Sequence, residues 1–159
     1  MTHHELKHSV ENLLYDYAAC LNNRQYEDFP AFFEEENCRY EIQSRENYDL
    51  GLPTPIMGCF SHGMIKDRVA QLVDGTLTYH NLNLRHYISN LRVEEEQAGI
   101  VKARSNFQVI QSDQEGISNL YLVGRYEDEI LISEGSLKFV KKIAILDSFA
   151  IHNMLAVPV

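Results

Sequence analysis

The chain has 159 residues, enough to bury one substantial hydrophobic core and too few for two ordinary domains, so we expect a single domain over residues 1–159. Its hydrophobic fraction of 45% and charged fraction of 23% are those of an average globular protein, and no apolar run approaches the roughly 20 residues that span a bilayer. A balance of 14 basic against 23 acidic residues gives a formal charge of −9, which argues against nucleic acid or anionic membranes as partners and leaves proteins or small molecules.

The first half of the chain has the signals of three helices. Thr2 and Glu5 form a capping-box pattern, and apolar residues then recur at helical spacing until about Asn22. Asp28 precedes a Phe-Pro pair and two further phenylalanines, which predicts a short second helix with proline in its first turn. Ser61 can cap a third helix whose apolar residues face one way.

The rest of the chain has the signals of strands and turns. A short strand is expected over residues 39–43, followed by a long irregular loop over residues 44–58, where glycine and proline gather. From residue 82 onward apolar and polar residues alternate, and further strands are expected in GIVKARSNFQVIQS, NLYLVGRYEDEILI and SLKFVKKIAIL. This order predicts an α+β fold in which N-terminal helices pack on one face of a curved antiparallel sheet.

The N-terminus and the cysteines indicate a reducing compartment. Residues 1–14 lack the basic lead, apolar stretch and cleavage site of an export signal, so we expect a cytoplasmic protein. Cys20, Cys38 and Cys59 cannot all pair within one chain, and reduced thiols are therefore expected.

One motif has half of the spacing of a Rieske iron–sulfur site. The segment CFSH, from Cys59 to His62, supplies the Cys-x-x-His half, but the segment CRY, which begins at Cys38, has Tyr40 where the first histidine, that of the Cys-x-His half, would stand. A neutral phenol is a poor substitute for imidazole at that iron. We therefore expect no metal and no cofactor in this chain, and we expect Cys38 and Cys59 to be small buried apolar residues.

A pocket between helices and a curved sheet could also support acid–base chemistry. Asp16 or His86 could serve as a general base, and the Tyr40 hydroxyl could hold an enolate oxygen. His86 shares its strand face with leucines, however, where a buried, hydrogen-bonded core histidine is the commoner outcome. A free-standing dehydratase, isomerase or cyclase stays as the alternative hypothesis, and a small-ligand binding protein is a third.

Two arginines are candidates for ordered ion pairs. Arg68 and Arg85 can pair with carboxylates in a bidentate manner, and Asp67 or the acidic run at residues 94–96 could supply partners within or between subunits. The alternative for both arginines is an ordinary exposed charge, whose pairings contribute little to stability.

Four segments, in this order along the chain, carry a family resemblance: DFPAFFEEENCRYEIQSREN, YDLGLPTPIMGCFSHGMIKDRVAQL, LRHYISNLRV and KKIAILDSFAIHNMLAVPV. Together they cover nearly the whole chain. The chain thereby resembles the small (beta) subunits of aromatic-ring-hydroxylating (Rieske non-haem iron) dioxygenases, most of all the terephthalate and salicylate oxygenase type. The resemblance implies the cystatin-like cone of the nuclear-transport-factor-2 superfamily.

The resemblance also implies a division of labour between two kinds of chain. In that family the large (alpha) subunit holds the Rieske [2Fe-2S] cluster and the mononuclear iron, while the small subunit carries no redox centre. The small subunit helps to build a hexamer of three large and three small chains, which includes a trimer of small subunits. The implied function is thus a non-catalytic subunit that stabilises and arranges a large oxygenase subunit acting on an aromatic acid.

On this interpretation several residues are structural rather than catalytic. Asp67, Arg68, Arg85 and His86 are expected to organise packing or subunit contacts, and residues 79–93 are expected to form a central strand of the cone. The candidate interface elements are the loop RENYDLGLPTPIMG and the C-terminal segment FAIHNMLAVPV, both apolar for segments that would otherwise be exposed.

Overall fold

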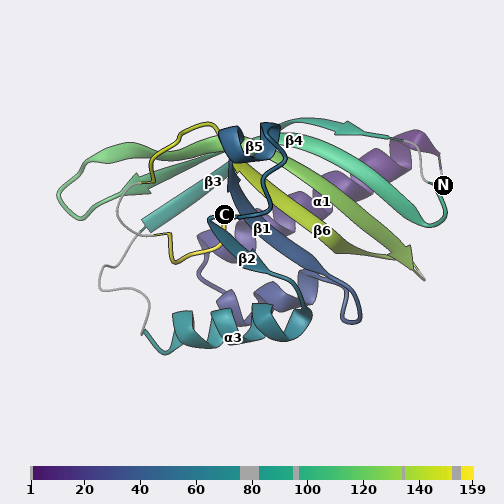
Figure 1. The fold of residues 1–159 in the computed structure, drawn as a ribbon, viewed down its shortest axis with the longest axis horizontal. Helices are drawn as coiled ribbons and strands as arrows, with labels where there is room; N and C mark the ends of the chain where they lie inside the picture. The colour runs from purple at the N-terminus through teal and green to yellow at the C-terminus, as the bar shows by residue number, and fades with distance from the viewer. Residues whose placement is uncertain (1, 76–82, 95–96, 134, 152–154) are drawn as a thin grey trace.

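The computed structural model describes residues 2–75, 83–94, 97–133, 135–151 and 155–159, and the fold is built from these (Figure 1). The helices and strands follow one another as α1 (His3–Asn22), η1 (Tyr26–Phe32), β1 (Arg39–Ser44), α2 (Arg45–Asp49), β2 (Met57–Cys59), α3 (His62–Val73), β3 (Asn83–Val93), β4 (Ile100–Ser112), β5 (Ser118–Ser133) and β6 (Ser136–Leu146). The predicted α+β class, with N-terminal helices on a curved sheet, is confirmed.

Both long helices begin where their capping residues predict. The Glu5 backbone N–H donates to Thr2 Oγ1 at 3.2 Å and the Thr2 backbone N–H donates to Glu5 Oε2 at 2.7 Å, which completes the capping box of α1. Ser61 Oγ accepts from the Met64 backbone N–H at 3.2 Å and caps α3. These side chains satisfy backbone donors that have no partner inside the helix, so the predicted starts are confirmed.

The second predicted helix differs in type and in position. It is the 3₁₀ helix η1, which begins at Tyr26 rather than after Asp28 and places Pro30 near its C-terminal end. The Asp28 backbone N–H donates to the Gln25 carbonyl at 3.0 Å, a bond of the short i to i+3 type that makes a tight turn of this kind. Asp28 therefore lies inside the element and not at its cap.

The six strands form one sheet in the order β2-β1-β6-β5-β4-β3. Neighbouring strands are antiparallel, as predicted, except that β1 and β6 run parallel, with Arg39 opposite Lys141 and Ser44 opposite Leu146. The expectation of a central strand over residues 79–93 is wrong for the described part, because β3 lies at the edge of the sheet; residues 79–82 lie outside the described residues.

The edge position of β3 is compensated by α1, which packs beside it. The side-chain oxygen of Asn22, in the last turn of α1, accepts the His86 backbone N–H at 2.7 Å. An edge strand otherwise offers unpaired backbone groups to other chains, so this contact protects part of the edge.

The expected loop over residues 44–58 contains two short elements. Ser44 caps α2 by accepting the Asn47 backbone N–H at 3.3 Å, and β2 pairs with β1, with Tyr40 opposite Cys59. The prediction of an irregular loop is correct only for the segment between these elements. The apolar side chains of that segment remain outside the core, and the exposed ones are Leu50, Leu52 and Ile56.

The core fills the space between the helices and the inner face of the sheet. In Figure 1, α1 passes behind the strands and α3 lies below them. In β4 the predicted alternation of apolar and polar faces is confirmed. The buried side chains are those of Val101, Ala103, Phe107 and Val109, and the exposed ones on the other face are those of Lys102, Arg104, Asn106 and Gln108. No helix among the described residues is long and apolar enough to cross a membrane.

Candidate functional site

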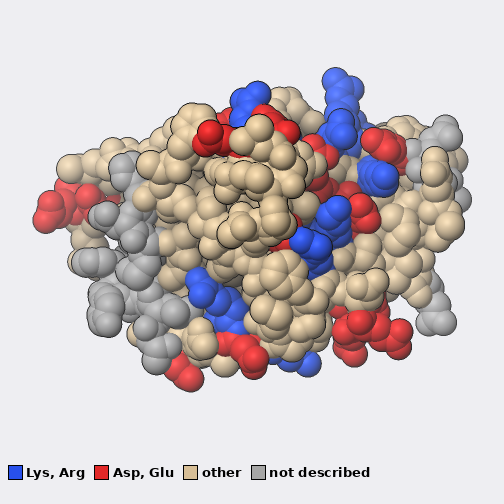
Figure 2. All heavy atoms as spheres, viewed as in Figure 1, with Lys and Arg blue, Asp and Glu red and all other residues tan. Residues whose placement is uncertain are grey.

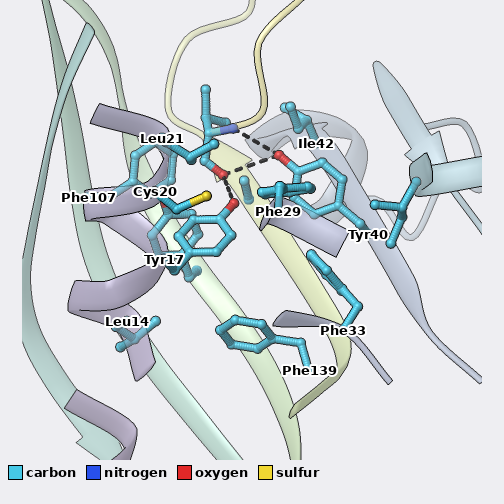
Figure 3. Packing of buried hydrophobic residues seen from close by; sticks show 14 of the residues in the cluster. Leu14, Tyr17, Cys20, Leu21, Phe29, Phe33, Tyr40, Ile42, Phe107 and Phe139 are labelled. Atoms are coloured by element: carbon cyan, nitrogen blue, oxygen red, sulfur yellow. Dashed lines mark hydrogen bonds between the residues drawn. The ribbon is translucent and has the colours of Figure 1, made fainter. Parts of the chain in front are cut away.

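Aromatic rings occupy the interior of the cone, where an enzyme of this shape would hold its substrate. The Tyr17 ring centroid lies 5.6 Å from that of Phe29 and 5.8 Å from that of Phe139, and Tyr126 stacks on Phe107 at 4.3 Å. Figure 3 shows Tyr17 of α1, Phe29 of η1 and Phe139 of β6 lying close together in this interior. Pairs of rings at such distances contribute beyond the area that they bury, so the interior is a packed core.

The C-terminal residues 156–159 close this interior. The Tyr17 hydroxyl donates to the Val159 carbonyl oxygen at 2.6 Å, and the Tyr40 hydroxyl donates to the same oxygen at 3.2 Å. The Val159 backbone N–H in turn donates to the Tyr40 hydroxyl oxygen at 2.9 Å (Figure 3). The cavity that remains beside Tyr40 and Pro158 measures about 10 Å³, which is space for about one water molecule and not for an organic substrate.

Both phenols stay neutral in this setting. Burial raises the pKa of Tyr17 well above its usual value, and burial also raises the pKa of Tyr40 although its bonds to Val159 and Tyr17 act in the opposite direction. Each hydroxyl therefore keeps its proton at physiological pH and serves as a hydrogen-bond donor to the C-terminal segment.

A fully buried ion pair lies beside the aromatic rings. Lys142 Nζ donates to Asp128 Oδ1 at 3.2 Å and to Oδ2 at 3.1 Å, and neither side chain is exposed at all. The ammonium group also lies 3.7 Å from the ring centroid of Tyr126 and 4.5 Å from those of Tyr17 and Phe139. Burial raises the pKa of Asp128 and lowers the pKa of Lys142, in each case against the attraction of the partner.

The sequence offered a signal for this pair that our prediction did not use. In β5, Asp128 lies between Tyr126 and Ile130 among the alternate residues whose side chains face inward. The pairing of β5 with β6 places Asp128 opposite Lys142. A carboxylate in the buried phase of a strand needs a partner, because an unpaired buried charge is strongly unfavourable. The identity of that partner depends on strand pairing.

The structure does not gather the predicted acid–base residues into one pocket. Asp16 is exposed on α1, whereas Tyr40 and His86 are buried. The Tyr40 hydroxyl is engaged by Val159, and His86 Nδ1 lies 2.9 Å from Asn22 Oδ1, to which it donates. His86 Nε2 has no hydrogen-bond partner among the described residues.

Burial makes His86 sensitive to acid. It lowers the pKa of His86 to about 4, and the Pro158 backbone opposes this only in part. The unfolded chain gains a proton near pH 6.5 whereas the folded chain resists protonation until about pH 4, so stability that is present above pH 6.5 is lost as the pH falls through this window.

We expect His86→Gln to reduce this pH dependence. Between neutral pH and about pH 5 the wild-type chain should lose about 2 kcal/mol of unfolding free energy through His86, and the variant should lose correspondingly less. Urea unfolding followed by circular dichroism at the two pH values measures both losses. Equal losses in the two proteins would show that His86 is accessible to protons in the folded chain.

The predicted structural residues have different environments. Arg68 is half-buried and donates to the carbonyl oxygens of Leu155 at 3.1 Å and Ala156 at 3.4 Å, so it binds the C-terminal segment, and it pairs with no carboxylate among the described residues. Asp67 and Arg85 are both exposed. The C-terminal segment is thus the partner of Arg68, a contact between residues 87 and 88 positions apart that sequence spacing alone did not reveal.

The residues of the partial Rieske motif have other bonds. Cys38 and Cys59 are buried free thiols, as expected, and burial raises the pKa of each. Cys59 Sγ lies 3.7 Å from the Met64 carbonyl oxygen, and His62 Nε2 lies 3.0 Å from that of Pro30. Within the described part of the chain, no three His, Cys, Asp or Glu side chains are grouped so that they could hold a metal ion.

Comparison with known proteins gives one consistent result. A family model described as the ring hydroxylating beta subunit matches residues 17–153. The small subunit of anthranilate 1,2-dioxygenase from Burkholderia cepacia is 34% identical, and the alignment covers 90% of this chain and 88% of that protein. Subunit beta 2 of the terminal oxygenase component of terephthalate 1,2-dioxygenase from Comamonas sp. is 26% identical, with coverage of 89% and 91%.

A solved structure agrees with the sequence relatives. The chain is similar to a protein from Novosphingobium aromaticivorans that is assigned as the beta subunit of an aromatic-ring-hydroxylating dioxygenase. The TM-score is 0.88, the sequence identity is 29%, and the match covers 98% of each chain.

Proposed function

This chain belongs to the family of ring-hydroxylating dioxygenase beta subunits, and we propose that its task in the oxygenase is structural, with the chemistry carried by the large subunit. The fold is accordingly the cystatin-like cone of the nuclear-transport-factor-2 superfamily. As a small subunit it is part of an oxidoreductase complex that pairs with an alpha oxygenase subunit.

The filled cone is the observation that carries this proposal. An enzyme that held its substrate inside the cone would need a site of hundreds of cubic ångströms there, with convergent polar groups, whereas the space beside Tyr40 is about 10 Å³. The hydroxyls of Tyr17 and Tyr40 are bonded to the chain's own Val159. The Lys142–Asp128 pair has no exposed surface through which a substrate could reach it.

The cofactors of such an oxygenase do not fit the residues of this chain. Tyr40 replaces the first histidine of the Rieske pattern and is held by Val159, while His62 is bonded to a backbone carbonyl. A Rieske site needs two thiolates and two imidazoles arranged around two irons. We therefore assign the [2Fe-2S] cluster and the mononuclear iron to the large subunit.

Exposed apolar side chains indicate where subunits would meet. Leu50 is 67% exposed and Leu52 is 46% exposed in the segment between α2 and β2, and Phe60 and Met64 are exposed beside it. Figure 2 shows largely uncharged surface over the middle of this face, where that segment lies. Permanent complexes commonly bury thousands of square ångströms, and exposed apolar groups of this kind suit such an interface.

The expected C-terminal interface divides into two parts. Phe149 is 75% exposed and can contact another chain, but residues 156–159 are buried and bind the cone's own tyrosines. The prediction that the whole C-terminal segment is an exposed interface is therefore wrong for residues 156–159, because Val159 accepts from Tyr17 and Ala156 accepts from Arg68.

The similar small subunits belong to anthranilate and terephthalate dioxygenases, whose named substrates are aromatic acids. We assign the oxygenase of this chain to the same substrate class, with three large and three small subunits in the cytoplasm. The small subunits would contact one another as a trimer. The choice of substrate within the class would lie in the large subunit, because the cone described here holds no substrate-sized space beside its polar groups.

Co-expression with the large oxygenase subunit of the same organism tests this function. Native mass spectrometry of the purified sample should show a hexamer of three large and three small chains, and iron analysis should assign the metal to the large chain. The control is the small chain expressed alone. A chain that remains free of the large subunit and catalyses dehydration or isomerisation by itself would contradict the proposal.

A further inference from the structure

A large groove lies on the surface between η1, α3 and the β5–β6 hairpin. Its volume is about 870 Å³, and it is open to solvent along part of its boundary. Apolar side chains from all three elements form its walls, namely Pro30, Ala31, Phe33, Val69, Ala70, Val73 and Leu131. Val73 is 47% exposed, so part of this apolar surface has no cover within the described chain.

Two basic side chains hold the walls of the groove in place. His62, at the start of α3, places Nε2 3.0 Å from the Pro30 carbonyl oxygen. Lys138, near the start of β6, donates from Nζ to the Ala31 carbonyl oxygen. Both bonds end on the last turn of η1, where the Pro30 carbonyl oxygen also accepts the Phe33 backbone N–H at 3.1 Å. The groove is therefore preorganised, and these two basic groups are already engaged.

The rim of the groove is acidic. Glu27, Glu34, Glu35 and Asp74 supply four carboxylates, against the ammonium groups of Lys66 and Lys138. Glu34 turns toward its own loop, where it accepts the Asn37 backbone N–H at 2.6 Å. Glu27, Glu35 and Asp74 form no ion pair with any residue in the described ranges. Their negative charge remains available to a partner.

We propose that this groove binds a segment of the large oxygenase subunit that inserts apolar side chains between η1 and α3 and carries lysine or arginine at its ends. The inference rests on the proposed function and deepens it by locating one contact of the partner. Apolar walls favour burial of apolar side chains, and the carboxylates at the rim select a cationic flank.

The groove fits a polypeptide segment of another protein better than a second copy of this chain. The exposed apolar segment of this chain, which includes Leu50 and Leu52, follows directly after the carboxylates of Glu46 and Asp49. Asp49 is paired with Arg45 at 3.7 Å and with Arg125 at 3.8 Å, which leaves the Glu46 carboxylate to meet the acidic rim with like charge, at a cost in affinity. The net charge of −9 opposes self-association at this surface in the same way.

The first test introduces charge into the apolar wall. Ala70→Lys with Val73→Lys places two ammonium groups where apolar, cation-flanked residues would insert. Leu120→Lys with Val123→Lys is the matched control on the exposed face of β5, with the same change in charge. With an affinity-tagged large subunit, the recovered ratio of small to large chain should fall at least tenfold for the groove variant and less than twofold for the control.

The second test reverses the charge of the rim. Glu27→Lys with Glu35→Lys should also lower recovery at least tenfold at physiological ionic strength, whereas Glu94→Lys with Glu115→Lys, at exposed positions outside the groove, should not. The wild-type complex should further lose small subunit as salt is raised, because screening weakens exposed charge pairs. Thermal midpoints of the separate small chains verify that all four variants fold.

The outcomes separate this inference from the function on which it rests. If the wild-type chain does not bind the large subunit, the proposed function fails. If the wild-type chain binds and both groove variants bind equally well, the function stands and the groove assignment is overturned. If Ala70→Lys with Val73→Lys lost binding and Glu27→Lys with Glu35→Lys did not, the proposal that the bound segment carries lysine or arginine at its ends would be overturned. If the groove variants lost only the self-association of the small chain, the groove would be assigned to a second copy of this chain.

Discussion

Asp128→Ala is expected to lower the free energy of unfolding by about 3–5 kcal/mol, because it leaves the Lys142 ammonium buried without its counter-charge. In the wild-type chain Lys142 Nζ contacts both carboxylate oxygens of Asp128, and both side chains are completely buried. The rings of Tyr17, Tyr126 and Phe139 surround the ammonium group but supply only part of the lost attraction.

The control for this experiment replaces both partners at once. Asp128→Leu with Lys142→Met removes both charges and replaces them with apolar side chains, so it should be much more stable than Asp128→Ala. Urea unfolding near neutral pH measures the three proteins. A loss below about 1 kcal/mol in Asp128→Ala would mean that water reaches the pair and that the charges are not desolvated.

The double variant also tests whether the pair has a chemical role. On the structural interpretation, Asp128→Leu with Lys142→Met should assemble with the large subunit and should support its activity, because only packing is required of this position. If a complex of normal composition lost activity with the pair replaced, Lys142 or Asp128 would have to act on a reacting group.

Deletion of residues 156–159 is expected to cost about 5 kcal/mol or more. Val157 and Val159 are buried, and each such side chain contributes roughly 1.5–3 kcal/mol. The deletion also removes the carbonyl oxygens that accept from Tyr17, Tyr40 and Arg68, and each buried donor left without a partner costs about 1–3 kcal/mol.

A graded series makes this result interpretable. Val157→Ala with Val159→Ala shortens the two side chains but keeps the backbone bonds, so it should lose less than the deletion. Val73→Ala with Val123→Ala makes the same change at exposed positions and should have little effect. Chemical unfolding followed by circular dichroism compares all four proteins.

The same deletion distinguishes the structural role from the alternative enzyme. A truncated chain that kept its stability and bound small aromatic molecules would show that the cone is a ligand pocket with a removable cover. We expect instead a destabilised chain, because the C-terminal segment contributes to the core through Val157 and Val159.

The predicted features that proved right depend on short stretches of sequence. The capping box of Thr2 and Glu5 and the cap at Ser61 involve residues three positions apart. The inward phase of β4 follows from alternation within a single strand. Each of these signals is local, because the residues that produce it are near neighbours in the sequence.

The predicted features that failed depend on what lies beside a segment in space. The position of β3 at the sheet edge follows from the order of strand pairing, which the alternation of Asn83–Val93 does not reveal. The same holds for β1, whose parallel pairing with β6 joins the first strand of the chain to the last. An edge strand with one buried face has the same period of two as a central one.

Short stretches of sequence are therefore enough to predict the helix starts and the inward faces of the strands, and four segments in order are enough to indicate the family. What fills the cone depends on the assembled fold, because the contacts that fill it join residues 14, 119 and 142 positions apart: Lys142 with Asp128, Tyr40 with Val159 and Tyr17 with Val159. Helix caps and alternating faces are fixed by forces between near neighbours. Contacts across the chain form only when the whole core closes, and no local pattern ranks one distant partner above another.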